Sequence, residues 1–243
     1  MYFFRLIFFL MFINWHSKNK YYIQPQMEWK PVKIEAYVIN LKKRDDRLRM
    51  FLKQCPLQNV QREDAVNGKE SGYILKRMYR NCLSPGEQGC FLSHINLWKK
   101  QVSREIDYFI IFEDDAIFSD DFVYIFDNII FNLKKSITYI GGRFERNFKM
   151  QNKYCMKVNE YLVKEKINKK EKYNASQYDR TTHAYIIHKD YAKLLLNSLK
   201  IKLFSFKPVD HYILKVLRFY NQDIYSSNPL ICHSPFDNES DIR

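Results

Sequence analysis

The chain has 243 residues, with 40 lysines and arginines against 27 acidic residues and a formal net charge of +13. Hydrophobic residues make up 46% of it and aromatic residues 16%, which excludes a disordered protein and allows a sizeable core. The basic balance favours polyanionic partners, such as phosphorylated substrates, an anionic membrane surface or nucleic acid. The five cysteines show neither a C-x-x-C pair nor zinc-type Cys/His spacing, which argues against structural zinc.

The amino terminus is strongly apolar. Residues 2–15 are nearly all aromatic or aliphatic, and a polar, basic stretch follows at 16–20. The run is shorter than the ~20 residues of a bilayer-spanning helix, and no small-x-small cleavage site follows it. We predict a hydrophobic anchor or signal-like segment plus linker over 1–31 and a folded domain over 32–243. The alternative for the apolar run is an added helix or strand packed on the domain.

The folded domain opens with a strand, a turn and a basic helix start. Residues 34–41 have a strand pattern, and helical apolar spacing begins at Leu48. Arg44 and Arg47 fall at the helix start, where backbone N–H groups favour anions. These arginines are predicted either to contact a diphosphate or to be ordinary solvated helix residues.

A second helix has a clear start signal at residues 84–87. Ser84 suits the N-cap, a proline follows, and Glu87 completes a capping box. Glu87 therefore has a structural task, with a catalytic role as the alternative. His94, next to Ser93, is either a core histidine or a group of the functional site.

The most informative stretch is residues 108–115. Five large apolar residues predict a strand buried on both faces, and Glu113, Asp114 and Asp115 follow directly. Alternation along an extended chain predicts Glu113 and Asp115 on one side and Asp114 on the other. Clustered carboxylates at the carboxyl end of a strand suit Mg²⁺ or Mn²⁺ beside substrate phosphates. The alternative is a solvated charge run.

Further helices and strands alternate after the triplet. Patterns predict a helix after Ser119, strands at 137–140 and 181–188, a helix at 189–199, another opened by residues 208–211, and short strands at 224–225 and 230–232. The basic stretch 143–172 is predicted as a solvated insertion, with a flap over a diphosphate as the alternative. Asp210, in the first turn of its helix, is either a helix-dipole acid or a catalytic one.

Four sequence blocks follow one another in a characteristic order. They are VINLKKRDDR at 38–47, GEQGCFLSH at 86–94 with Trp98, IFEDDA at 111–116, and AYII at 184–187 followed by PVD at 208–210. Together they resemble glycosyltransferase family 25, which includes lipooligosaccharide and procollagen galactosyltransferases. The resemblance spans about residues 34 to 241, and the G-E-x-G-C-x-x-S-H block followed by E-D-D is its most specific part. One departure is Thr182-His183, where the family often has a glycine.

The resemblance implies a GT-A type (Rossmann-like) α/β catalytic domain with a mostly parallel sheet flanked by helices. It also implies a UDP-sugar donor, most often UDP-galactose, a glycan or hydroxylated protein acceptor, Mn²⁺ or Mg²⁺, and inversion at the anomeric carbon. Membrane association through the amino terminus is expected, on the cytoplasmic face or in the ER/Golgi lumen, and nucleic acid is not expected as a partner. The implied site residues are Glu113 and Asp115 for the metal; Asn40, Arg44, Arg47, Ser93, His94 and Asp114 for the donor; and Asp210, Glu87 and Asp114 for catalysis.

An inverting transfer needs a carboxylate to accept the proton of the acceptor hydroxyl. We predict Asp210 as this base, with Glu87 as second choice. The rival interpretations are a catalytically inactive relative that binds membrane or nucleic acid through its basic surface, and a metal-dependent phosphoesterase or nuclease. The second is disfavoured because no further distant Asp/His motif of the usual kind is present.

Overall fold

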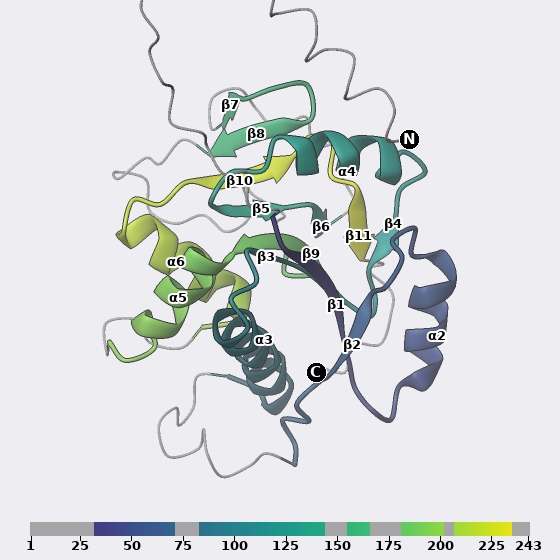
Figure 1. The fold of residues 1–243 in the computed structure, drawn as a ribbon. Helices are drawn as coiled ribbons and strands as arrows, with labels where there is room; N and C mark the ends of the chain where they lie inside the picture. Colours follow the sequence, from purple (N-terminus) through teal and green to yellow (C-terminus); the bar gives the residue numbers. More distant parts are fainter. Residues whose placement is uncertain (1–31, 71–82, 144–154, 166–180, 202–206, 235–243) are drawn as a thin grey trace, which may run out of the picture. The chain divides into compact units, whose positions relative to one another are not determined.

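The computed structural model describes residues 32–70, 83–143, 155–165, 181–201 and 207–234 (Figure 1). An eight-stranded sheet with the order β2-β1-β3-β9-β5-β10-β8-β7 forms its centre. These strands are β1 Ile34–Asn40, β2 Gln61–Asp64, β3 Tyr108–Glu113, β5 Ile137–Tyr139, β7 Cys155–Lys157, β8 Leu162–Glu165, β9 Ala184–His188 and β10 Ile224–Ser227.

Most strands of this sheet run in one direction. β1 is parallel to both β2 and β3, and β5 is parallel to β10. β9 lies between β3 and β5 and is antiparallel to both. The carboxyl end of β3 therefore meets the amino end of β9 at one rim of the sheet, a juxtaposition on which the functional site depends.

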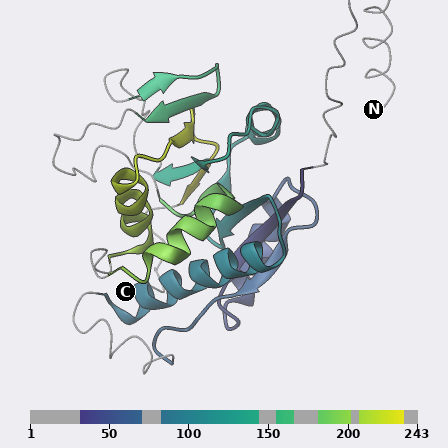
Figure 2. The same ribbon diagram turned by 60° about the vertical axis from the view of Figure 1, so that its left-hand side comes forward.

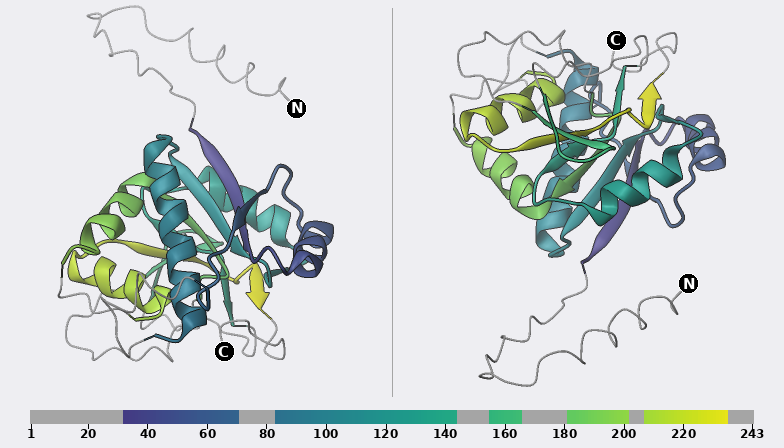
Figure 3. Two further views of the ribbon diagram at one scale, coloured as in Figure 1. Left: turned by 90° about the horizontal axis from the view of Figure 1, so that it is seen from below. Right: turned by 90° about the horizontal axis from the view of Figure 1, so that it is seen from above.

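Helices cover both faces of the sheet, as two separate apolar clusters show. Side chains alternate along β1, so Tyr37 packs on one face and Val38 on the other. The Tyr37 face is covered by α3 (Pro85–Ser103), α5 (Lys189–Ser198) and α6 (Val209–Phe219). The Val38 face is covered by α2 (Asp45–Gln54) and α4 (Phe122–Phe131). Figure 2 shows α3 and α5 side by side, and Figure 3 (left) shows α3 crossing the sheet.

A three-stranded sheet with the order β4-β11-β6 adjoins the main one. It consists of β4 (Ile117–Phe118), β6 (Gly141–Arg143) and β11 (Cys232–Ser234). β4 begins only two residues after the acidic triplet. β11 pairs antiparallel with β4 and parallel with β6. This pairing brings the end of β11 to the same rim as the carboxyl end of β3.

The start of α3 is fixed by its cap and by a close backbone contact. Ser84 accepts a hydrogen bond from the Glu87 N–H, and the Glu87 carboxylate accepts one from the Ser84 N–H, which confirms the predicted capping box. A Cβ on Gly89 would lie 2.3 Å from the carbonyl oxygen of Val66, and one on Gly68 would lie 1.5 Å from that of Pro85. Glycine at both positions lets the chain after β2 pass directly against α3.

The predicted α/β class, with a mostly parallel sheet between helices, is confirmed. The insertion at 143–172 contains the β7–β8 pair, which the polar composition of that stretch did not signal. The predicted amino-terminal anchor and linker (1–31) lie outside the described residues. Among the helices that are described, none has the length and apolarity to cross a bilayer.

Candidate functional site

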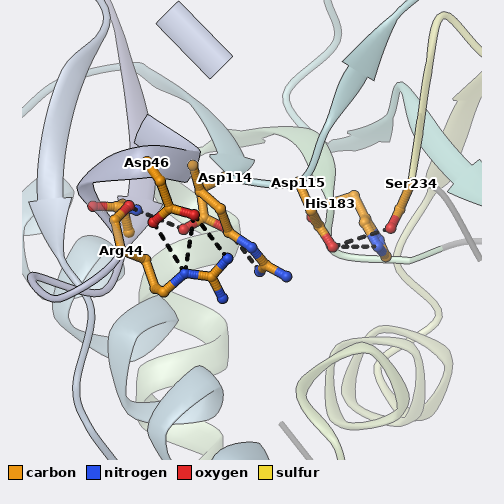
Figure 4. Close-up of polar contacts among 8 residues, drawn as sticks. Arg44, Asp46, Asp114, Asp115, His183 and Ser234 are labelled. Carbon is orange, nitrogen blue, oxygen red and sulfur yellow. Dashed lines mark hydrogen bonds and ion pairs between the residues drawn. The ribbon is translucent and has the colours of Figure 1, made fainter. Parts of the chain in front are cut away.

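The acidic triplet lies where β3 leaves the sheet, and its three carboxylates divide between two environments. Asp114 points toward the start of α2, whereas Asp115 points toward His183 and Ser234 (Figure 4). Glu113 shares the Asp115 side, with ligand atoms of Glu113, Asp115 and His183 all within 4.8 Å of one another. The predicted alternation of these three side chains is confirmed.

Asp114 is held by residues that follow β1. Since Ile39 is paired with Glu113, the next residues along the two strands, Asn40 and Asp114, are neighbours. The Asn40 amide donates to Asp114 Oδ2 at 2.6 Å, and Arg47 from α2 lies 3.3 Å from Oδ1. Burial raises the pKa of Asp114 to about 6, although the Asn40 hydrogen bond and the Arg47 charge oppose that shift. Asp114 thus ties β3 to β1 and α2.

Glu113, Asp115 and His183 form a trio of oxygen and nitrogen donors that a divalent cation can use. Thr182 donates to Glu113 at 2.6 Å, and Ser234 donates to Asp115 Oδ2 at 3.0 Å. Asp115 Oδ1 and His183 Nδ1 are buried and have no hydrogen-bond partner within the described part of the chain. Buried polar atoms are normally paired, so two such atoms in one trio fit a site that binds a cation.

The two carboxylates of this trio differ in their ease of ionisation. Burial opposes ionisation of Glu113, but the hydrogen bonds from His94 and Thr182 and the nearby histidine charge together lower its pKa. Burial and the negative charge of Glu113 raise the pKa of Asp115, against the effects of His183 and Ser234. A bound cation would favour the ionised form of both.

A buried chain of hydrogen bonds stands behind Glu113. His94 Nε2 lies 3.3 Å from Glu113 Oε1, and His94 Nδ1 lies 2.8 Å from the Tyr185 hydroxyl. Trp98 donates its indole N–H to the same hydroxyl at 3.1 Å. An ionised carboxylate can only accept, so in neutral His94 the proton lies on Nε2, which donates to Glu113, and Nδ1 accepts from the Tyr185 hydroxyl. His94, Trp98 and Tyr185 are each fully buried, which makes this chain a rigid support for Glu113.

The two arginines predicted beside the nucleotide interact with carboxylates of the protein. Arg44 forms an ion pair with Asp46 at 3.0 Å near the surface, and Arg47 binds Asp114 as described. Asn40 also donates to the carbonyl of Arg44 at 2.8 Å, which fixes the turn into α2. Donor binding by Asn40, Arg44 and Arg47 stays a prediction.

The hydroxyl of Ser93 has a structural task. It donates to the Gly89 carbonyl at 2.7 Å and accepts the Val66 N–H at 2.9 Å, and the residue is fully buried. These contacts join α3 to the segment after β2. A role of Ser93 in donor binding would therefore be indirect.

The two predicted bases, Glu87 and Asp210, both act electrostatically on Cys90. Burial raises the pKa of the Cys90 thiol well above its usual range, and the charges of Glu113, Asp210, Asp115 and Glu87 raise it further. The Cys90 thiol is therefore affected by four carboxylates, which come from α3, from β3 and the turn after it, and from α6. The Glu87 carboxylate is already engaged in the capping box, and Asp210 Oδ1 accepts the adjacent His211 N–H at 2.8 Å.

Several residues of the site are not evident from the sequence. His183 and Thr182 precede β9, and they reach Glu113 only because β9 runs antiparallel to β3. Ser234 reaches Asp115 through the pairing of β11 with β4. No spacing pattern connects these positions with the triplet. The one sequence signal is that Thr182-His183 departs from the usual glycine of the resembling family.

This α/β domain, with carboxylates and a histidine gathered at one rim of the sheet, has the architecture of an enzyme domain that binds its substrate at the strand ends. The sequence model of glycosyltransferase family 25 (LPS biosynthesis protein) matches residues 33–213, well over half of the chain. The chain belongs to this family, which confirms the resemblance seen in its motifs.

Individual relatives cover different shares of the chain. The lipooligosaccharide biosynthesis protein lex-1 of Haemophilus influenzae is 30% identical over 161 residues, 62% of this chain and 49% of the relative. Procollagen galactosyltransferase 1-A of Xenopus laevis is 30% identical over 199 residues, 74% of this chain and 30% of the relative. The mouse inactive glycosyltransferase 25 family member 3 is 33% identical over 103 residues, 36% of this chain and 17% of the relative. The chain thus spans less than half the length of each of these proteins.

A solved glycosyltransferase involved in glycosylation of the major capsid of PBCV-1 covers 86% of this chain and 95% of its own at a TM-score of 0.43 and 9% identity. This likeness is too weak to add to the fold described above.

Proposed function

We propose that the protein is a metal-dependent glycosyltransferase that transfers a hexose from a UDP-sugar to a hydroxyl of a glycan or protein. The proposed hexose is galactose, and the configuration at its anomeric carbon is inverted. Membership of family 25 supports the reaction class, and the relatives named as procollagen galactosyltransferases support the sugar. The observation that carries the proposal is the convergence of Glu113, Asp115 and His183, whose ligand atoms lie within 4.8 Å of one another. Two polar atoms of this trio are also buried without a hydrogen-bond partner in the described part of the chain.

Glu113, Asp115 and His183 are the residues proposed to hold Mn²⁺ or Mg²⁺. When bound, the cation would stabilise the negative charge that grows on the departing diphosphate. Thr182 and Ser234 orient the two carboxylates by hydrogen bonds, and the His94–Tyr185 chain fixes Glu113 from behind. Asp114 faces away from this trio and binds Asn40 and Arg47, which holds the ends of β1 and β3 together. We therefore assign Asp114 a structural role in the site.

A single substitution at Asp115 tests the metal site. Asp115→Asn removes one anionic ligand but keeps the side-chain shape, so Mn²⁺-dependent hydrolysis or transfer from UDP-galactose should fall below detection while the urea midpoint stays similar. Asp120→Asn, at an exposed position after the triplet, is the matched control and should keep full activity. Equal activity of the wild-type protein in excess EDTA would refute the metal role. Normal donor affinity without turnover on any acceptor would favour the inactive relative that binds ligands only.

Asp210 is the proposed base, because the Glu87 carboxylate is engaged at the start of α3. Positioned acid–base groups contribute roughly 10²- to 10⁴-fold to rate, so Asp210→Asn should lower the transfer rate by about that factor with donor affinity retained. Glu87→Gln should instead lower the urea midpoint, since its amide is a weaker acceptor for the Ser84 N–H, and keep most of the rate. Steady-state kinetics and urea unfolding of both variants measure the two effects. The reverse pattern would assign the base to Glu87.

A further inference from the structure

A second group of metal-ligating side chains adjoins the proposed Mn²⁺ trio. The Cys90 sulfur, a nitrogen of His94 and a Glu113 oxygen all lie within 4.8 Å of one another. Cys90 and His94 are four residues apart on α3 and so share one face of the helix. Cys90 is a free thiol, and Cys90 and Glu113 each keep some exposure as residues, whereas His94 is buried.

The chemistry of this group differs from that of the first trio. A thiolate, an imidazole and a carboxylate suit Zn²⁺ or Cd²⁺, whereas the carboxylate-rich trio suits Mn²⁺ or Mg²⁺. In a tetrahedral zinc site with bonds of about 2.0–2.3 Å, ligand atoms lie roughly 3.3–3.8 Å apart, so shifts of about 1 Å or less would close the observed group on an ion. The negative charges of Asp210, Asp115 and Glu87, which act on Cys90 together with that of Glu113, favour a cation there.

We propose that Cys90, His94 and Glu113 form an inhibitory site for a thiophilic divalent cation such as Zn²⁺. On binding, the Cys90 thiol releases its proton to water and the thiolate donates an electron pair to the ion. The His94 proton moves from Nε2 to Nδ1, where the Tyr185 hydroxyl accepts it in a hydrogen bond, so that Nε2 can bind the ion. No oxidation state changes. Glu113 belongs to both groups, so its capture by the thiophilic ion removes a ligand from the productive cation. The inhibitory consequence rests on the proposed function, whereas binding of the ion does not.

Binding is tested with Co²⁺ as a spectroscopic probe on the purified full-length protein. Coordination by Cys90 should give a sulfur-to-cobalt charge-transfer band in the near ultraviolet, which added Zn²⁺ abolishes. The band should be lost in both Cys90→Ser and Cys90→Ala, and circular dichroism checks that each variant folds. Cys55→Ser is the matched control, because Cys55 is a free thiol at the end of α2, outside this group, and its replacement should leave the band unchanged. A wild-type protein without the band, or Cys90 variants that retain it, overturn the proposal.

Inhibition is tested separately at a fixed Mn²⁺ concentration. Loss of ligand-supporting groups at a metal site typically lowers affinity roughly 10- to 100-fold, so the Zn²⁺ concentration for half-inhibition should rise at least about tenfold in Cys90→Ser. Equal inhibition of wild type and Cys90→Ser would overturn the inhibitory role. If Mn²⁺ supports no activity in the wild type, the proposed function fails, but the cobalt spectrum still decides whether the thiophilic site exists.

Discussion

At the scale of single residues, the site is organised by shared side chains. Glu113 accepts hydrogen bonds from His94 and Thr182 and belongs to both groups of metal-ligating residues. Its position therefore matters more than that of either neighbouring acid. Tyr185, which hydrogen-bonds with His94 and Trp98, takes part in fixing that position.

Tyr185→Phe tests the buried chain behind Glu113. The variant leaves the Trp98 N–H without its acceptor and removes the donor to His94, and unpaired buried polar groups cost about 1–3 kcal/mol each. We expect a lower free energy of unfolding by roughly that amount and a raised Mn²⁺ requirement for activity, measured by urea unfolding and metal titration. Tyr108→Phe, on β3, is the control, because the Tyr108 hydroxyl makes no hydrogen bond to another residue that the structure describes. A Tyr185→Phe variant with an unchanged Mn²⁺ requirement would show that the chain serves stability alone.

Several of these residues were predictable and others were not. The buried strand and the acids that follow it fixed the place of the triplet, and alternation fixed which two acids share a side. The partners of the triplet depend on contacts across the sheet: Asp114 meets Asn40 through parallel pairing with β1, and Asp115 meets His183 through antiparallel pairing with β9. Local patterns do not carry the direction of a neighbouring strand, so His183 and Ser234 could not be assigned.

At the scale of elements, local signals predicted most helices well. Ser84, Pro85 and Glu87 marked the start of α3, and the structure has the capping box there. At α4 the outcome differs, because the N-cap is Asp121, without a side-chain hydrogen bond, and Ser119 instead accepts the Phe122 N–H with its backbone carbonyl. The helix α5 begins with an unusual cap, since His188 Nδ1 accepts the Asp190 N–H at 3.2 Å.

This histidine cap predicts a pH-dependent stability. Burial lowers the pKa of His188, with Lys135 and Lys189 acting in the same direction and Asp190 and Asp107 opposing. The folded state therefore binds the proton less readily than the unfolded state. The contribution of the cap is present above the unfolded pKa of about 6.5 and is lost as the pH falls through the lowered folded value.

The measurement is the free energy of unfolding in urea at about pH 7.5 and about pH 5, on either side of the unfolded histidine pKa. His188→Asn is the control, because asparagine caps a helix without titrating in this range. The wild type should lose about 1 kcal/mol more than His188→Asn between the two values, which is the usual contribution of a cap. Parallel losses in the two proteins would assign the pH dependence to other groups.

At the scale of the whole molecule, the described fold begins at residues 32 and 33. The Lys33 N–H donates to the Asp107 carboxylate at 3.0 Å, and its carbonyl accepts the Tyr108 N–H at 3.0 Å. These two bonds attach the start of β1 to the start of β3. Both bonds involve residues from 33 onward, which leads us to expect that the domain folds without the first 31 residues.

Removal of residues 1–31 is the corresponding prediction. A chain that starts at Val32 keeps both Lys33 bonds, so its urea midpoint and donor affinity should match those of the full chain, while co-sedimentation with anionic lipid vesicles should decrease. A chain that starts at Ala36 is the control, since it lacks both bonds and the first two residues of β1, and it should unfold at lower urea. Undiminished vesicle binding by the chain that starts at Val32 would contradict an anchor in the first 31 residues.

The reversed direction of β9 has a consequence for how this enzyme class can diversify. Thr182 and His183 lie on the approach to β9, while the register of Ala184–His188 against β3 is set by buried side chains, of which Tyr185 also supports Glu113. Substitutions on this approach should therefore leave the packed apolar groups beneath it in place. New preferences for sugars or ions could arise there with little loss of foldability.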